Sequence, residues 1–269
     1  MARIVQKYGG SSLATVEAIG RMADKIAQTV QNGAEVAVVV SAMGRTTDGL
    51  LALAGEVSDA PPPRELDLLL STGEIVSASL MAMALGRRGI PAVAMTGAQA
   101  GLYTDGAFGR AQLIAFDTAH VEAALARGWV PVVAGFQGVS PTGDVTTLGR
   151  GGSDTSAVAL AAAIAADRCE IYTDVDGVYS ADPRRDADAC RFSCLTYEEA
   201  LRLAENGAKV IHPDAVRWAM RSGIPLIIAR NDASDPLAEG TLIASADFRW
   251  KTPAAQGAAE VRTAAGARK

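Results

Sequence analysis

The feature that most constrains the fold is an alternation of short apolar segments with longer helical ones, recurring about every 30 residues as in βαβ units. Residues 36–40 form a β-branched run that is typical of a parallel strand covered by helices on both faces. Strands are predicted at 3–8, 36–40, 90–95, 130–135, 169–173, 225–229 and 240–243. Helices are predicted at 16–30, 48–58, 66–88, 121–127, 157–166, 197–206 and 213–222. This order predicts an α/β fold, a three-layer α-β-α sandwich around a mostly parallel sheet.

Glycines and composition shifts refine this order. The helix at 66–88 is expected to bend or break near Thr72 and Gly73, and the glycine-rich stretch 101–110 predicts a loop or a short hairpin. A boundary near residue 165 would divide the chain into an N-terminal lobe, 1–165, and a C-terminal lobe, 166–248. Residues 249–269 lose their apolar period and predict a flexible tail.

Composition excludes several classes of partner. Of the 269 residues, 49% are hydrophobic and 20% charged, as in an ordinary globular protein. The net charge of −5 gives no basic field for nucleic acid or an anionic membrane, so neither is expected as a partner. We expect a cytoplasmic protein, because no signal peptide is evident and no charge-free apolar run reaches about 18 residues. The spacing of Cys169, Cys190 and Cys194 with His212 fits no familiar zinc site, which favours reduced, structurally incidental thiols.

The stretch TTLGRGGSDTSA, residues 146–157, carries the strongest local signal for a ligand. It follows the apolar run VPVVAGFQGV, which predicts a buried strand, and it precedes an alanine-rich helix with Ser153 or Asp154 placed to cap it. The first turn of a helix offers free N–H groups to an anion, and glycines let ligand and backbone approach closely. Arg150 adds a planar fork suited to a carboxylate or phosphate.

The loop KYGGSS, which follows the first strand, has the composition of a phosphate cradle. Lys7 supplies a point charge from an otherwise apolar strand, and Gly9, Gly10 and Ser11 form the turn. A tight strand-to-helix turn without a ligand is an equal alternative. No P-loop and no dinucleotide-binding glycine motif is present in the sequence.

Other polar groups follow the remaining predicted strands. Ser41 and Thr47 lie in SAMGRTT, while Glu74 lies in STGE among apolar residues, where a helix N-terminal carboxylate is the alternative interpretation. The segment TDVDGVYSADPR supplies acids, a tyrosine and an arginine, although two consecutive turns would explain its composition as well. Lys209, in NGAKVIHP, is also explained as a partner of a helix dipole.

Taken together, these segments resemble the motifs of one family, the aspartokinases. KYGGSS resembles the family's KFGGTS opening, and SAMGRTTDGLL resembles its strand-end serine followed six residues later by a threonine. Further motifs match in the family's order: STGE, GFQGV, TTLGRGGSDTSA, TDVDGVYSADPR and NGAKVIHP. AMRSGIPLIIARNDASDPLAEGTLI is similar to the segment that closes the family's catalytic domain. The resemblance covers residues 3–245.

The resemblance implies the amino-acid kinase fold and transfer of the γ-phosphoryl group of ATP, as its Mg²⁺ complex, to the β-carboxylate of L-aspartate. By position, the phosphoryl group would be held by Lys7, Gly9, Gly10 and Ser11. The aspartate pocket would be lined by Ser41, Thr47, Glu74, Phe136, Arg150, Ser153 and Asp154. The nucleotide would be surrounded by Thr173, Asp174, Tyr179, Arg184, Lys209 and Val210. No direct protein ligand for the metal is implied.

Elementary chemistry agrees with this assignment. A carboxylate acceptor is ionised at neutral pH, so no general base is required. The task is to bring an anionic acceptor to an anionic donor, mainly by positioning and charge neutralisation. Arg150 would pair with the α-carboxylate of aspartate, Glu74 with its ammonium group, and Lys7 with the transferring group. Asp154 has three open roles: helix cap, partner of the ammonium group, or support for the metal.

The resemblance also leaves alternatives. Aspartokinases usually continue into paired ACT domains that bind lysine or threonine, and we expect this chain to lack them and their feedback control. A homodimer is expected, and a separate regulatory subunit is possible. Arg45, beside the acceptor site, leaves open another small carboxylic acid or amino-acid analogue as acceptor. A non-catalytic regulatory partner is the third hypothesis, although such a subunit has no need for so many intact site residues.

Overall fold

A computed structural model describes residues 1–181, 186, 188–206 and 210–249. The predictions made for Arg184, for Lys209 and for residues 250–269 of the tail lie outside the described residues.

The core of the molecule is an eight-stranded sheet with the order β10-β12-β11-β9-β1-β2-β6-β3. Its strands are β1 (Arg3–Tyr8), β2 (Glu35–Val40), β3 (Ala92–Met95), β6 (Val130–Ala134), β9 (Arg168–Thr173), β10 (Cys194–Thr196), β11 (Leu226–Arg230) and β12 (Thr241–Ala244). Neighbouring strands run parallel except for β11 and β12, which are antiparallel. The mostly parallel sheet predicted from the sequence is therefore confirmed.

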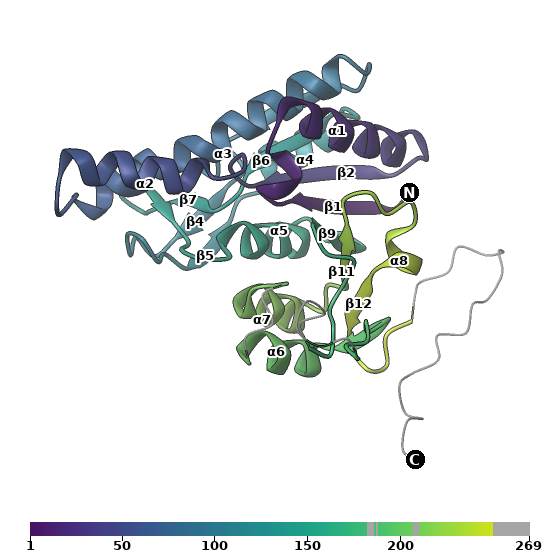
Figure 1. Cartoon of the computed structure of the whole chain (residues 1–269). Helices are drawn as coiled ribbons and strands as arrows, with labels where there is room; N and C mark the ends of the chain where they lie inside the picture. The colour runs from purple at the N-terminus through teal and green to yellow at the C-terminus, as the bar shows by residue number, and fades with distance from the viewer. Residues whose placement is uncertain (182–185, 187, 207–209, 250–269) are drawn as a thin grey trace.

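Helices cover both faces of this sheet (Figure 1). The helices are α1 (Val16–Gln31), α2 (Thr46–Val57), α3 (Pro63–Gly86), α4 (Ala119–Ala126), α5 (Gly152–Ala163), α6 (Tyr197–Glu205), α7 (Pro213–Ser222) and α8 (Pro236–Glu239). The apolar faces of α1 and α3 pack into one core cluster, and those of α4, α5, α6 and α7 pack into the other. Along β2, Ala37 and Val39 join one cluster while Val36, Val38 and Val40 join the other, which explains why the strand is apolar throughout.

A second, smaller sheet has the order β5-β4-β7-β8. It is built from β4 (Leu102–Thr104), β5 (Leu113–Phe116), β7 (Gln137–Val139) and β8 (Val145–Thr147). The antiparallel pair β4–β5 is the short hairpin that the glycine-rich stretch predicted. The prediction of one buried strand over residues 130–139 is wrong: β6 ends at Ala134, and β7 starts in the other sheet. The chain turns at Phe136, whose φ of 67° lies in the left-handed region.

The helix that was predicted to bend or break near Thr72 and Gly73 does not break, because α3 runs without interruption from Pro63 to Gly86. Gly73 serves packing instead. A Cβ at this position would lie 2.9 Å from the Cβ of Ala42, in the loop after β2. The glycine thus allows the helix to approach that loop, and the continuous helix carries Glu74 in its middle.

Helix α3 is long and apolar enough to cross a membrane by length and composition, in contrast to the expectation from the sequence. Its packing accounts for this composition, because α3 contacts β3, β6 and β8 and contributes Met81 and Leu85 to the core. It also buries two carboxylates, Asp67 and Glu74, whose hydrogen-bond donors come from neighbouring loops. We interpret α3 as a core helix.

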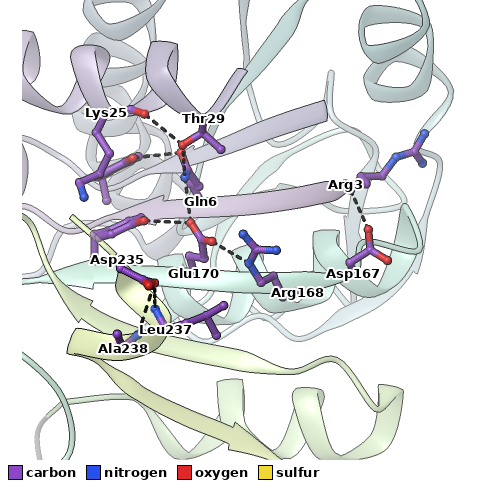
Figure 2. A network of polar contacts seen from close by, with 12 residues as sticks. Arg3, Gln6, Lys25, Thr29, Asp167, Arg168, Glu170, Asp235, Leu237 and Ala238 are labelled. Carbon is purple, nitrogen blue, oxygen red and sulfur yellow. Dashed lines mark hydrogen bonds and ion pairs between the residues drawn. The ribbon is translucent and has the colours of Figure 1, made fainter. Parts of the chain in front are cut away.

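A buried polar network joins β1 to β9 (Figure 2). Glu170, only 2% exposed, accepts hydrogen bonds from Gln6 Nε2 at 2.8 Å and from Tyr172 OH at 2.9 Å. Arg168 Nε donates to the other oxygen of Glu170 at 2.7 Å. The main sheet therefore passes residue 165 without a break. The division into lobes at 1–165 and 166–248 stays a prediction.

Candidate active site

The site begins with an ion pair at the carboxyl end of β1. Lys7 Nζ lies 2.6 Å from Asp154 Oδ1, with side-chain exposures of 11% and 13%. Lys7 comes from the end of the central strand, and Asp154 from the first turn of α5. Because parallel strands end at the same edge of the sheet, the loops after β1, β2, β6 and β9 meet around this pair.

The glycine turn after β1 packs tightly against the loop after β2. A Cβ on Gly10 would lie 2.9 Å from Ala42 O and 3.0 Å from Gly44 O, so this position has no space for a side chain. Gly44 N donates to Gly10 O at 2.9 Å. On the other side, Ser12 Oγ donates to Asn231 Oδ1 at 2.7 Å. The predicted cradle is therefore a close-packed turn whose position both neighbouring loops determine.

Glu74, in helix α3, is 3% exposed. Its Oε1 accepts a hydrogen bond from Ala42 N at 3.0 Å, while its Oε2 is buried without a partner. Burial raises the pKa of the Glu74 carboxyl to about 7, because the charged form loses its hydration. A buried carboxylate oxygen without a donor is what a cationic ligand group would satisfy. The alternative of a helix N-terminal carboxylate is wrong, since Glu74 lies in the middle of α3.

The start of α5 differs from the prediction that Ser153 or Asp154 caps the helix. The N-cap is Gly151, with a φ of 70° and no side-chain cap, and the helix begins at Gly152. Ser153 and Asp154 therefore lie inside the first turn, where the carboxylate is near the positive end of the helix and reaches Lys7. Arg150 is exposed between the left-handed Gly149 and Gly151.

The remaining acceptor-side residues have different degrees of support. Ser153 is 8% exposed and packs beside Gly135, where a Cβ would lie 3.1 Å from the Ser153 Cβ. Phe136 N donates to Ser156 Oγ in α5 at 3.1 Å. Ser41 follows β2, and its N–H donates to Tyr8 O at 3.0 Å. No side-chain hydrogen bond or ion pair in the described part ties Thr47 or Arg150 to this cluster.

The expected nucleotide residues follow β9, the neighbour of β1. Thr173 Oγ1 donates to Asp174 Oδ1 at 3.1 Å, and Tyr179 OH donates to Asp176 at 3.0 Å. Val210, partly buried, begins the short segment before α7. His212, the N-cap of α7, packs on the glycine loop before α5: a Cβ on Gly151 would lie 2.2 Å from the His212 Cβ. This contact brings the expected nucleotide segment against the loop of Arg150.

Neither the cysteines nor the acidic residues form a metal site in the described part of the chain. No group of three or more His, Cys, Asp or Glu side chains there is arranged to hold an ion. Cys169, Cys190 and Cys194 are free thiols, as expected.

A cavity of about 370 Å³ lies beside the glycine turn, between α1 and the loop after β11. Its lining includes Ser11, Ser12, Arg21, Lys25, Asn231 and Asp232. Lys25 Nζ donates to Ala233 O across it and stands 4.7 Å from the centroid of the Tyr172 ring. Of the predicted site residues that the structure describes, only Ser11 lines this cavity, so we place the chemistry at the Lys7–Asp154 pair instead.

Comparison with known proteins identifies the family. Residues 2–230 match the model of the amino acid kinase family. The chain belongs to the amino acid kinase family. As expected from this membership, the fold is the family's α/β arrangement around a mostly parallel sheet, and UMP kinase from Bacillus anthracis shares it at a TM-score of 0.68 and 19% identity.

Within this family, the most similar proteins that we compared are aspartokinases. The aspartokinase of Mycobacterium tuberculosis strain H37Rv is 50% identical over 268 residues, which cover 98% of this chain and 63% of that protein. Aspartate kinase from Synechocystis superposes with a TM-score of 0.80 at 47% identity, over 91% of this chain and 40% of that one. Escherichia coli aspartokinase III, in complex with aspartate and ADP, superposes with a TM-score of 0.78 at 32% identity, over 90% of this chain and 64% of that one. The chain thus spans about three fifths of the length of the curated relatives it matches.

Sequence reasoning missed three residues that organise this site of the amino acid kinase fold. Asp67 precedes Glu74 by two helical turns on α3 and accepts hydrogen bonds from Thr147 and Gly109. Asn231 holds Ser12, and His212 packs on Gly151. Only Asp67 had a usable signal, since it shares a helix face with Glu74; the other two contacts join segments far apart in sequence.

Proposed function

We propose that this chain transfers the γ-phosphoryl group of ATP to the β-carboxylate of L-aspartate, giving 4-phospho-L-aspartate. The observation that carries the proposal is the buried Oε2 of Glu74, which has no partner. The other oxygen of Glu74 binds Ala42 N, in the loop that packs on the glycine turn just after Lys7, and Lys7 pairs with Asp154. The similarity to aspartokinases over 98% of the chain supports the same reaction.

The acceptor side supplies complementary charge for an amino acid. Glu74 Oε2 would accept a hydrogen bond from the ammonium group, and the exposed fork of Arg150 would pair with the α-carboxylate. Ser41, Thr47, Phe136 and Ser153 would complete the pocket around the side chain. With both ends of the amino acid held, the β-carboxylate is the end left free to react.

The donor side supplies positioning and charge neutralisation. Gly10 and Ser11 would offer backbone N–H groups to the phosphoryl oxygens, while Gly9, whose N–H donates to Tyr172 O, would let the turn approach them closely. Lys7 would neutralise charge that develops between donor and acceptor. The base and ribose of ATP would lie against Thr173, Asp174, Tyr179 and Val210, with Arg184 and Lys209 as expected partners of the phosphates. Mg²⁺ would be held by the phosphates of ATP and would supply further charge neutralisation. Asp154 is the carboxylate that lies beside Lys7.

A hydroxylamine-trapping assay tests the proposal. The purified chain is incubated with MgATP, hydroxylamine and one of a panel of acceptors, and the hydroxamate formed from the acyl phosphate is measured. We expect hydroxamate with L-aspartate. If hydroxamate forms only with another small carboxylic acid or amino-acid analogue, the chain is a kinase whose acceptor is not aspartate. Arg45, beside the acceptor site, is the reason for testing this alternative. Absence of product with every acceptor would favour a non-catalytic regulatory partner.

Assembly and location follow from the same proposal. We propose a homodimer in the cytoplasm, with a separate regulatory subunit as a possible partner and no nucleic acid or membrane partner. Light scattering during size-exclusion chromatography at several protein concentrations measures the mass directly. A monomer at every concentration would contradict the dimer.

A further inference from the structure

The carboxylate of Asp67 joins the end of β8 to the loop between β4 and β5, and the proposed site depends on both. Asp67 lies in α3 and is only 1% exposed. Its Oδ2 accepts from Thr147 N at 2.7 Å and from Gly109 N at 2.9 Å. Its Oδ1 accepts from Thr147 Oγ1 at 2.8 Å and from Gly109 N at 3.0 Å. Both oxygens are satisfied, so this buried charge has a complete set of donors from two other segments.

Both segments contact the loop that carries Arg150. Thr147 ends β8, and the loop that follows carries Gly149, Arg150 and Gly151 into α5. Gly109 supports the same loop from beside it, because a Cβ on Gly149 would lie 3.2 Å from Gly109 O. Leu148 N donates to Phe136 O at 2.9 Å, which fixes the next residue as well.

Arg150 itself has no such support. Its side chain is exposed and makes no hydrogen bond or ion pair within the part of the chain that the structure describes. Its two glycine neighbours have left-handed φ angles of 73° and 70°. The position of the Arg150 backbone, from which the free side chain extends, is therefore set by the contacts at each end of the loop: the Asp67 clamp on one side and the packing of His212 on Gly151 on the other.

We propose that Asp67 is a positioning residue that sets the place of Arg150 and thereby the affinity for the α-carboxylate of the acceptor. This inference rests on the proposed function. Asp67 touches no reacting atom; it holds Thr147 and Gly109 so that the guanidinium meets the acceptor without a search over loop conformations. Its effect is expected on the KM of the acceptor and not on the transfer step.

A double-mutant cycle with Arg150 tests the inference. Asp67→Asn places an amide donor opposite a backbone donor, and we expect the KM for L-aspartate to rise at least 10-fold, with kcat and the KM for ATP within about 3-fold. Arg150→Ala alone should raise the same KM. In the Arg150→Ala background, Asp67→Asn should add less than 2-fold, because it acts through the side chain already removed.

Two further variants control for general damage to the fold. Arg64→Gln, one turn earlier on α3, breaks the bond from Arg64 Nε to Asp144 at the far end of the β7–β8 hairpin and should leave the acceptor KM unchanged. Thr147→Val removes the hydrogen bond from Thr147 Oγ1 to Asp67 and keeps the bond from Thr147 N. The KM for aspartate in this variant should therefore lie between the values for the wild type and for Asp67→Asn. Thr147→Val carries the test if Asp67→Asn fails to fold.

Amide hydrogen exchange separates this inference from the proposed function. Exchange at Gly109 and Thr147 should accelerate in Asp67→Asn and stay slow in Arg64→Gln, whether or not the chain turns over aspartate. Equal fold-changes of Asp67→Asn in the wild-type and Arg150→Ala backgrounds would overturn the positioning role, as would a fall in kcat at constant KM. A wild-type chain without any turnover would instead overturn the proposed function.

Discussion

At the scale of single residues, Glu74 combines a proposed binding role with a cost in stability. Its pKa is about 7 in the folded chain against 4.5 in the unfolded one, because burial disfavours the charged form. The unfolded state therefore releases its proton at lower pH. The folded chain carries the full cost of the buried charge above pH 7, about 3 kcal/mol, and loses it as pH falls toward 4.5.

Glu74→Gln should consequently change stability in a pH-dependent way. Above pH 7 the unfolding free energy of the variant should exceed that of the wild type. This excess should shrink by about 3 kcal/mol as the pH falls from 8 to 4.5. Urea unfolding at several pH values measures it. A difference that does not vary with pH would show that the carboxyl is not perturbed. In the same variant, the KM for aspartate should rise, since the ammonium loses its partner.

Lys7 and Arg150 should affect different kinetic constants. Lys7→Met removes the charge at the transferring group, so kcat should fall by about 10²–10³-fold while the KM for ATP changes little. Arg150→Ala should mainly raise the KM for aspartate, because in the proposed pocket the charge of Arg150 pairs with the α-carboxylate, which does not react. Steady-state kinetics with each substrate varied in turn distinguish the two. Unchanged aspartate kinetics in Arg150→Ala would make the pocket assignment wrong.

At the scale of elements, α3 is placed by a glycine within it. Replacing a glycine inside a helix by alanine normally raises the free energy of unfolding by about 0.5–1 kcal/mol. Gly55 in α2 has open space around it, so Gly55→Ala should show this increase. Gly73→Ala should instead lose about 1–3 kcal/mol, because its Cβ would lie 2.9 Å from the Ala42 Cβ. Thermal unfolding of both variants measures the contrast. Equal stabilisation would show that the loop at Ala42 yields freely.

The same substitution should disturb the site. Displacing Ala42 moves the N–H that donates to Glu74 and the carbonyl that packs on Gly10. We therefore expect Gly73→Ala to raise the KM for aspartate while Gly55→Ala leaves it unchanged. A rise in this KM would show that helix α3 links acceptor binding to the packing of the loop after β2.

At the scale of the whole molecule, the main sheet couples the two predicted lobes. One core cluster contains residues from Val5 to Ile243, and β1 pairs in register with β9. We expect a single cooperative unfolding transition. Variants that keep only Trp129 or only Trp218, with the other tryptophans replaced by phenylalanine, report on residues before and after 165. Coincident urea midpoints are expected, and separate midpoints would show independent lobes.

The buried network at β1 and β9 should contribute to this coupling. Glu170→Leu removes the acceptor of Gln6 Nε2, shown in Figure 2, and of Tyr172 OH, and both donors are buried. We expect the free energy of unfolding to fall by about 3–5 kcal/mol, because Arg168 also loses Glu170 as an ion-pair partner. Chemical unfolding checks the value. A loss below about 1 kcal/mol would mean that the network relaxes around an apolar side chain.

The sequence by itself determined the features that depend on local pattern. The apolar run at residues 36–40 predicts a strand buried on both faces, and periodic residues in α1 predict the helix that covers one of them. The ordered motifs identified the family, and they predict which loops carry the chemistry. These features can be predicted from the sequence because the periods of strands and helices, and the residue types of turns, depend on residues close together in the chain.

Only the tertiary structure decided where packing between distant segments outweighs local preference. Gly73 predicts a bend or a break, yet α3 is continuous, with Glu74 in its middle and Gly73 packed against Ala42 from the loop after β2. Ser153 and Asp154 predict a cap, yet Gly151 takes that position and Asp154 reaches Lys7 instead. Asp67 gains its donors from residues 42 and 80 positions away. Each outcome is set by a contact between segments that folding brings together, which no local pattern encodes.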